Sequence, residues 1–292
     1  MTLRVRAALL LVCVLWAVSF IATRVAVAST PPWTVVGLRL AFSALCFLAW
    51  GLARGVFRRV PGPRLIRQLF GLSLLGTGLH YGIQTVGMQY TTASNASVYS
   101  VTAPLTIAVL AAVVLRERLT LRKGLGILIA LVGVLTVMGW RSVLALELAG
   151  HLLGDALVMA SIVMWGLFTV FGKKITDELG ALTVTAWVTV LGAVTMIPVV
   201  MVELRLQTFA LAVITPQAWL AIAFLGIGCS FLATLLYFMA LQRTQSQQVG
   251  AYLYLIPPLT ALVAHFSLQE ALAPSFFLGS ALILVGVRLT ET

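Results

Sequence analysis

Charge is scarce in this sequence. Only 9% of its 292 residues are Asp, Glu, Lys or Arg, whereas a soluble domain carries roughly 25%. So few charges cannot cover a water-exposed surface, which excludes an ordinary soluble protein. Instead, 61% of the residues are hydrophobic. The charge-free runs extend over about 18 to 23 residues, enough for a helix to cross the ~30 Å hydrocarbon core of a bilayer.

Acidic residues and cysteine are also few. The net charge is +11, but the basic residues lie between apolar spans and form no groove-sized patch, which argues against a nucleic-acid partner. Cys13, Cys46 and Cys229 all lie inside apolar spans and lack metal-ligand spacing, so we interpret them as small packing residues. We predict no catalytic residue, no metal and no cofactor.

One proline-broken segment occurs twice. Residues 95–104 are followed thirteen residues later by Glu117, and residues 248–257 are followed at the same distance by Glu270. A shift of 153 superposes Tyr99 on Tyr252, Pro104 on Pro257, Glu117 on Glu270, Leu119 on Leu272, Gly126 on Gly279 and Gly133 on Gly286. Duplicated broken helices are typical of secondary transporters, which bind their substrate between two repeats.

The sequence predicts an all-α integral membrane protein. Because backbone groups in lipid must bond internally, each apolar run is expected to be a helix. The ten predicted spans are 7–27, 33–52, 68–90, 94–115, 122–140, 153–172, 182–202, 217–241, 246–267 and 274–290. They divide into a first five-helix repeat (1–140), an outer linker (141–152) and a second five-helix repeat (153–292).

The basic residues predict the orientation. With the N-terminus in the cytoplasm, all Lys and Arg fall on that side except Arg24, Arg141 and Arg205 outside and Arg39 within a span. Because Lys and Arg favour cytoplasmic loops, both termini are expected inside. Five helices is an odd number, so the second repeat must enter from the opposite side, and the repeats are predicted to be inverted.

The two motifs resemble those of ten-helix, EamA-type members of the drug/metabolite transporter superfamily. The resemblance rests on residues 93–119 with Gly126 and Gly133, and on Gln248 through Glu270 with Gly279 and Gly286. It covers nearly the whole chain. It implies a bacterial inner-membrane exporter of amino acids and related metabolites, foremost aromatic and other neutral amino acids. The second copy departs from the pattern at Gln247-Gln248 and Pro257-Pro258.

Polar and aromatic residues inside the spans predict the substrate site, because such residues usually face a cavity. His80 and Gln84 share a helical face beside Tyr81, and Tyr237 corresponds to Gln84 under the same shift. The other predicted lining residues fall at matching positions of the repeats: Trp16, Phe20, Trp165, Thr169, Asn95, Tyr99, Gln248 and Tyr252. Neutral donors with aromatic faces suit a zwitterion with an apolar side chain.

Proline within a span predicts a flexible point. Pro104 and Pro257-Pro258 lie some ten residues into their spans and are interpreted as hinges, with a static kink as the alternative. Arg39 is interpreted as pairing with helix-end carbonyls near the outer interface. Glu117 and Glu270 are expected to act structurally at helix ends.

Other functions stay open at this stage. No Asp, Glu or Lys falls mid-span, so we expect facilitated export, with proton coupling through His80 as the alternative. An intramembrane enzyme would need a nucleophile with a base or a metal pair, but His80, His151 and His265 are far apart and no HExxH or GxSxG motif occurs. A channel would show a selectivity filter or a charged ring, and neither is visible in the sequence. The protein is expected to work as a monomer or a dimer in the lipid bilayer.

Overall fold

A computed structural model describes residues 1–58, 60–87, 90, 99, 101–138, 152–268 and 274–291. Its first helices are α1 (Leu3–Val27), α2 (Pro32–Ala53), α3 (Pro63–Ser73), α4 (His80–Gly87), α6 (Ala103–Val114) and α7 (Leu121–Met138). They are followed by α9 (Leu152–Leu179), α10 (Ala181–Leu206), α11 (Pro216–Phe224), α12 (Thr234–Arg243), α13 (Ser246–Tyr252), α14 (Ile256–Leu268) and α15 (Pro274–Glu291). No strand occurs within the described ranges.

Short segments of other helix types join or follow these elements. The π-helices η2 (Leu74–Leu79) and η4 (Leu225–Ala233) connect α3 to α4 and α11 to α12. The 3₁₀ segments are η1 (Val56–Arg58), η3 (Leu211–Val213) and η5 (Leu253–Leu255). Because η2 and η4 continue the flanking α-helices, α3–α4 and α11–α12 each form one long helical span.

The predicted all-α membrane fold is confirmed. Six helical stretches of the described chain are long and apolar enough to cross a bilayer: Leu3–Val27, Pro32–Ala53, Leu152–Leu179, Ala181–Leu206, Pro216–Arg243 and Pro274–Glu291. The described helices lie in or near the predicted ranges, while the number of ten spans stays a prediction. α9 extends past its apolar window, and in this extension the Lys173 amine donates to the carbonyls of Leu241 (2.5 Å) and Thr244 (2.6 Å), at the end of α12.

The helix bounds repeat along the chain. α9 and α10 begin 149 residues after α1 and α2, and α11, α14 and α15 begin 153 residues after α3, α6 and α7. The π-helix η2 likewise has its counterpart within η4 at the shift of 153. The extra four residues are accommodated within α10, which has 26 residues against 22 in α2.

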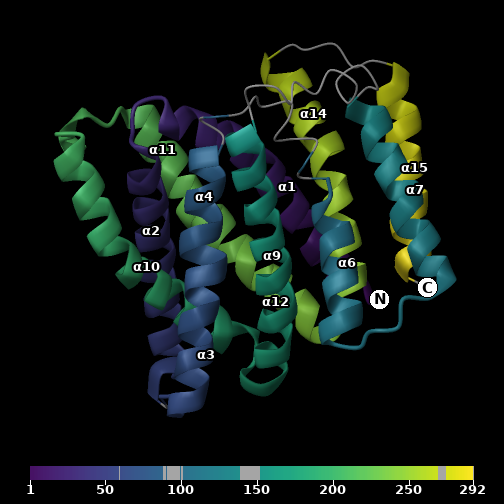
Figure 1. Cartoon of the computed structure of the whole chain (residues 1–292), viewed down its shortest axis with the longest axis horizontal. Coiled ribbons are helices and arrows are strands. Elements are labelled where there is room, and N and C mark those ends of the chain that lie inside the picture. Colours follow the sequence, from purple (N-terminus) through teal and green to yellow (C-terminus); the bar gives the residue numbers. More distant parts are fainter. Residues whose placement is uncertain are drawn as a thin grey trace.

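Counterpart helices α7 and α15 pack side by side at one edge of the molecule (Figure 1). A Cβ on Gly133 would lie 2.7 Å from the carbonyl oxygen of Gly279, and a Cβ on Gly286 would lie 2.5 Å from that of Gly126. Because Gly126 lies against Gly286 and Gly133 lies against Gly279, the two helices run antiparallel. Because these helices are counterparts, their antiparallel course means that the second half of the fold is inverted relative to the first.

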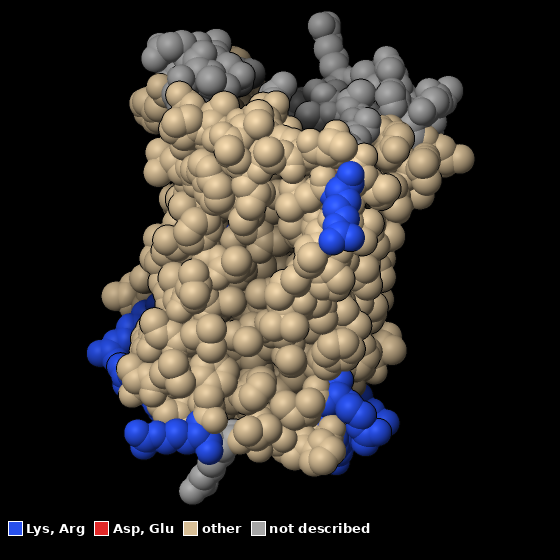
Figure 2. All heavy atoms as spheres, turned by 90° about the vertical axis from the view of Figure 1, so that its left-hand side faces the viewer, with Lys and Arg blue, Asp and Glu red and all other residues tan. Residues whose placement is uncertain are grey.

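The two chain ends lie at the same end of the molecule (Figure 1). Arg6 of α1 forms an ion pair of 2.7 Å with Glu291 of α15. Figure 2 shows Lys and Arg side chains gathered at the lower end of the face that it draws, with one further basic side chain toward the upper end. We call the end that carries the Arg6–Glu291 pair the terminal end.

Glu117 caps a helix of the other half. Its carboxylate accepts hydrogen bonds from the backbone N–H of Ser246 (2.9 Å) and of Gln247 (3.3 Å), at the first turn of α13. A carboxylate there satisfies two N–H groups that have no partner within the helix and interacts favourably with the helix dipole. The structural role expected for Glu117 therefore has a physical basis, whereas Glu270 lies outside the described residues.

Glu117→Ala is expected to lower the free energy of unfolding by about 0.5–2 kcal/mol, the usual cost of losing a helix cap. Thermal unfolding in detergent measures this effect, with the exposed neighbour Arg118→Ala as the matched control. Equal unfolding temperatures for the two variants would show that the cap contributes nothing.

Candidate functional site

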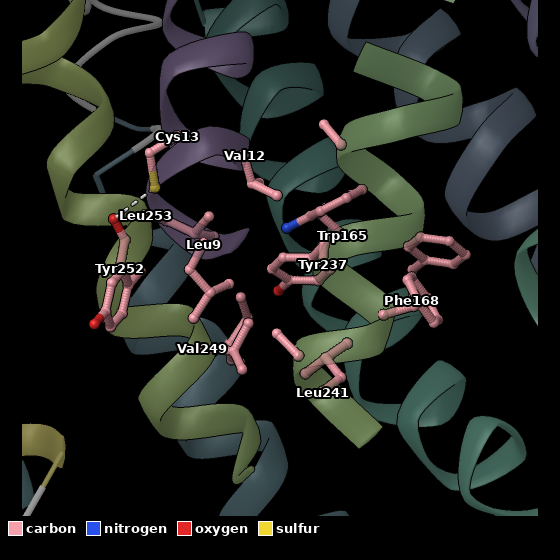
Figure 3. Packing of buried hydrophobic residues seen from close by; sticks show 14 of the residues in the cluster. Leu9, Val12, Cys13, Trp165, Phe168, Tyr237, Leu241, Val249, Tyr252 and Leu253 are labelled. Atoms are coloured by element: carbon pink, nitrogen blue, oxygen red, sulfur yellow. Dashed lines mark hydrogen bonds between the residues drawn. The ribbon is translucent and has the colours of Figure 1, made fainter. Parts of the chain in front are cut away.

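Two tryptophans at counterpart positions meet at the centre of the fold. The rings of Trp16 on α1 and Trp165 on α9 lie 5.3 Å apart, edge to face at 83°. Tyr237 on α12 completes the group, with its ring 5.2 Å from Trp16 and 5.6 Å from Trp165. Trp165 and Tyr237 are both buried (Figure 3). The structure thus brings together Trp16 and Trp165, which the repeat placed at matching positions, while their role in substrate binding stays a prediction.

His80 and Tyr81 extend this group at the start of α4. The His80 ring lies 5.2 Å from Trp165 and 4.9 Å from Tyr81. His80 Nδ1 lies 2.8 Å from the Ser161 carbonyl, so this nitrogen donates, because a carbonyl oxygen only accepts. We refer to Trp16, Trp165, Tyr237, His80 and Tyr81 as the ring cluster.

The ring cluster has few polar partners, and those beside Trp165, Tyr237 and His80 are neutral. The Thr169 and Tyr237 hydroxyls are 3.1 Å apart, and both side chains are buried. Gln84 lies one turn after His80 on α4 and is partly buried. The surroundings are apolar: Phe168 packs 5.4 Å from Trp165 and 5.1 Å from Phe238. Such a site can bind an apolar or aromatic side chain through ring faces.

Glycine and π-helical turns position the ring cluster. A Cβ on Gly76 in η2 would lie 2.0 Å from the Phe168 ring, so only glycine lets η2 approach α9 this closely. The π-helix η2 ends directly before His80, and η4 ends one turn before Tyr237. π-helical turns inside α-helices are frequently found at functional sites.

Tyr99 lies away from the ring cluster. Its hydroxyl donates to the carboxylate of Asp155 (3.3 Å) at the start of α9, and its ring packs against Val158 and Ile162. Asp155 is ten residues before Trp165, which is ~15 Å along a helix. Asn95 lies outside the described residues, as does the side chain of Phe20.

Gln248 and Tyr252 also lie apart, at the terminal end. Gln248 donates to the backbone carbonyls of Thr290 (3.2 Å) and Glu291 (3.1 Å), and the Tyr252 hydroxyl donates to the Glu291 carboxylate. Figure 3 shows Tyr252 separated from Trp165 and Tyr237, with its hydroxyl directed away from them. Helical spacing predicted that these residues share a face of the helix but did not indicate how far along the span that face lies from the ring cluster.

The prolines begin helices rather than interrupt them. Pro104 is in the first turn of α6, and Pro257 is the second residue of α14, directly after the 3₁₀ turn η5 that separates α14 from α13. The break before Pro257 is a change of helix type. It provides a place where α13 and α14 can reorient, so the hinge role stays a prediction with a defined location.

The interpretation of Arg39 was wrong. Its guanidinium carbon lies 4.0 Å from the centroid of the Tyr81 ring, and its Nε donates to the Ser230 hydroxyl (3.0 Å). In the described chain Arg39 thus borders the ring cluster and makes no hydrogen bond to a helix-end carbonyl. It is the basic residue that lies farthest from the ends of a predicted span, which was a signal for this role, but its partner Ser230 is 191 residues away in sequence.

Two cavities lie outside the ring cluster. The larger, about 350 Å³, lies between α1 and α14 and is lined by Val14, Ala17, Leu259, Leu262, Val263 and Phe266. The smaller, about 290 Å³, lies between the α3–η2 stretch and α9. The five rings of the cluster contact one another directly, so these five predicted lining residues are packed together.

A family model for EamA-like transporters matches residues 5–139 and 152–292 of the chain. An uncharacterized transporter of Archaeoglobus fulgidus is 28% identical over 285 residues, which cover 97% of this chain and 95% of the relative. A probable terminal-alkyne amino-acid exporter of Streptantibioticus cattleyicolor is 27% identical over 285 residues, 97% and 91% of the two chains.

A solved crystal structure of another protein shares the fold. It superposes with a TM-score of 0.80 at 21% identity, covering 98% of this chain and 96% of the other. The two family matches together span nearly every residue and coincide with the two sets of helices whose bounds repeat. The chain belongs to the EamA-like transporter family.

Proposed function

We propose that this protein exports aromatic and other neutral amino acids, or related small metabolites, by alternating access. The ring cluster carries the proposal, because it joins counterpart residues of the two inverted halves in a largely buried, aromatic site that contains no acidic side chain among the described residues. The similarity to a probable amino-acid exporter supports this substrate class. Residues 1–140 and 153–292 act as the two repeats, joined by the outer linker 141–152.

The ring cluster suits an amino acid with an apolar side chain. Ring faces of Trp16, Trp165 and Tyr237 bind the side chain and attract an ammonium group, and Thr169 and Gln84 provide neutral hydrogen-bonding groups. Drugs or other small metabolites with an aromatic part are the alternative substrates. Catalysis or channel function has no comparable support in the family or in the site.

Tyr99 and Tyr252 fit the role of gates at opposite ends of the site. They are counterparts at the shift of 153, and each hydroxyl donates to a carboxylate, of Asp155 or of Glu291. Asp155 itself is the counterpart of Arg6 at the shift of 149, and Arg6 pairs with Glu291. Breaking one tyrosine–carboxylate contact while the other forms would open the two ends in turn.

Tyr252→Phe is expected to open the terminal end more often. Cys13 reports this opening, because its buried thiol donates to the Tyr252 carbonyl (3.2 Å). With Cys46 and Cys229 replaced by alanine, Tyr252→Phe is expected to raise the rate of Cys13 alkylation severalfold. Tyr254→Phe is the matched control, since the buried Tyr254 hydroxyl has no hydrogen-bond partner in the described chain. Equal rates in both variants would remove Tyr252 as a gate.

Export is proposed to run down the substrate gradient. The buried carboxylates of the described helices, Asp155 and Glu203, lie within about one turn of a helix end, so the middle of the spans has no acidic proton carrier. Counterflow into proteoliposomes is expected to change by less than about twofold when a pH gradient is imposed. A strong dependence that disappears in His80→Phe would instead establish the proton-coupled alternative.

The proposal includes a location in the inner membrane with both termini in the cytoplasm, and a protein that works as a monomer or a dimer. The basic residues at the terminal end support this orientation. A counterflow panel of amino acids of graded size in proteoliposomes tests the substrate class. Saturable counterflow of phenylalanine or leucine is expected, and no counterflow of any amino acid would contradict the proposal.

A further inference from the structure

Arg39 is a buried cation that pairs with no acidic side chain of the described chain. Its side chain is 7% exposed, in the middle third of α2. It contacts the Tyr81 ring face and donates through Nε to Ser230, but within the described residues no Asp or Glu forms an ion pair with it. A charged side chain in a membrane span is costly and usually marks a functional site.

The surroundings of Arg39 hold its guanidinium in a defined place. A Cβ on Gly226 would lie 2.7 Å from the Arg39 carbonyl oxygen, so η4 packs directly on the backbone of α2. Ser230, in the same π-helix, fixes the Nε. In the described chain the two Nη nitrogens make no hydrogen bond, and they are the pair that binds a carboxylate in bidentate fashion.

The inverted half shows that the fold does not need this charge. At the shift of 153, Arg39 corresponds to Gly192 and Ser230 corresponds to Thr77. The equivalent contact is present, because a Cβ on Gly192 would lie 2.1 Å from the Thr77 hydroxyl oxygen. The same helix packing is thus made once with a guanidinium and once with no side chain. A purely structural role does not explain why one half retains a costly cation.

The guanidinium is linked to the tryptophans through a series of tilted ring contacts. Arg39 lies over Tyr81, Tyr81 contacts His80, and His80 contacts Trp165. A solute whose apolar part lies against the tryptophans therefore has a cation at one border of its site.

We propose that Arg39 binds the carboxylate of the transported solute. The inference rests on the proposed function and narrows it: the substrate has an anionic carboxylate together with an aromatic or apolar side chain. The tryptophans and Tyr237 select the side chain, and Arg39 selects the acid over the corresponding amine. Amines and cationic drugs are poor substrates, because a cation would be repelled by the guanidinium.

Binding to the purified protein tests the proposal with three probes: L-phenylalanine, 3-phenylpropanoate, which lacks the ammonium group, and 2-phenylethylamine, which lacks the carboxylate. Isothermal calorimetry is expected to show that the wild type binds 3-phenylpropanoate at least tenfold more tightly than 2-phenylethylamine. Arg39→Gln is expected to weaken the binding of both carboxylates by about tenfold to a hundredfold, the effect of losing a charge-assisted hydrogen bond. Binding of 2-phenylethylamine is expected to stay the same or to tighten.

Two further variants separate the carboxylate contact from folding. Arg39→Lys keeps the charge but loses the bidentate geometry, so an intermediate loss is expected. Ser230→Ala keeps the guanidinium and removes only its hydrogen bond, so a smaller loss than in Arg39→Gln is expected. If Arg39→Gln does not fold, the wild-type measurement still tests the proposal. Equal affinity of the wild type for 3-phenylpropanoate and 2-phenylethylamine would overturn it.

The experiments distinguish a failure of the carboxylate site at Arg39 from a failure of the proposed transport function. If no amino acid is transported but 3-phenylpropanoate binds and depends on Arg39, the carboxylate site stands and amino-acid export falls. If phenylalanine is transported and Arg39→Gln binds both carboxylates as tightly as the wild type, export stands and the role of Arg39 is overturned.

Discussion

Trp165→Ala is expected to reduce phenylalanine counterflow by more than tenfold. The Trp165 ring contacts four others, those of Trp16, His80, Phe168 and Tyr237, so its loss removes the centre of the proposed binding surface. Trp165→Phe keeps an aromatic ring at this place and is expected to retain most of the transport. The measurement is initial-rate counterflow in proteoliposomes with matched amounts of protein.

The control must separate binding from stability, because replacing a buried Trp by Ala typically costs ~3–5 kcal/mol. Trp219→Ala removes a tryptophan whose ring contacts Phe42 at 6.4 Å, outside the ring cluster. Each variant's thermal unfolding is recorded beside its transport. Folded Trp165→Ala with wild-type counterflow would show that substrate passes elsewhere.

Gly279→Ala is expected to give a large loss of stability for a single added methyl group. Its Cβ would lie 2.5 Å from the Gly133 carbonyl oxygen and 2.7 Å from the Val137 backbone nitrogen. Backbone atoms cannot rotate away, so α7 and α15 must separate along their contact. Overpacking of this kind costs about 1–3 kcal/mol, and the lost close contact between membrane helices adds to it. Thermal unfolding and the yield of folded protein measure the effect.

Gly124→Ala on α7 is the matched control. No atom lies within 4 Å of its Cβ position, and alanine in a helix is better than glycine by about 0.5–1 kcal/mol. The two substitutions are therefore expected to move the unfolding temperature in opposite directions. A Gly279→Ala protein as stable as Gly124→Ala would mean that the two halves do not meet through these glycines.

The repeat in the sequence identified residues at matching positions of the two halves as candidates for one shared site. Trp16 and Trp165 are counterparts, and counterparts near a two-fold axis must meet. The same shift, with five predicted helices in each copy, predicted that the two halves are inverted. The antiparallel packing of α7 on α15 through their glycines was not predicted and comes from the structure. These predictions needed only the shift between the copies and the odd number of predicted helices in each.

The sequence could not predict how far along its span a residue lies from the site, nor which side chains from distant segments contact each other. Helical spacing gave Tyr252 the same face as a lining residue, but its hydroxyl reaches Glu291 at the terminal end. The partner of Arg39 is a serine in a π-helical segment, and no sequence pattern indicated a change of helix type at that point. The burial of Asp155 beside Tyr99 likewise depends on how α9 packs.

Trans-stimulation of efflux tests the central claim most directly. Proteoliposomes loaded with labelled phenylalanine are diluted into buffer with or without unlabelled phenylalanine, and the rate of label release is compared. In a carrier whose site faces one side at a time, the site must return to the inside of the liposome after each release, and it returns faster with substrate bound. External substrate is therefore expected to accelerate the release of label up to a saturating maximum. Release that ignores external substrate and rises linearly with the internal concentration would mean an open pore and would contradict two inverted halves exchanging their conformations around the ring cluster.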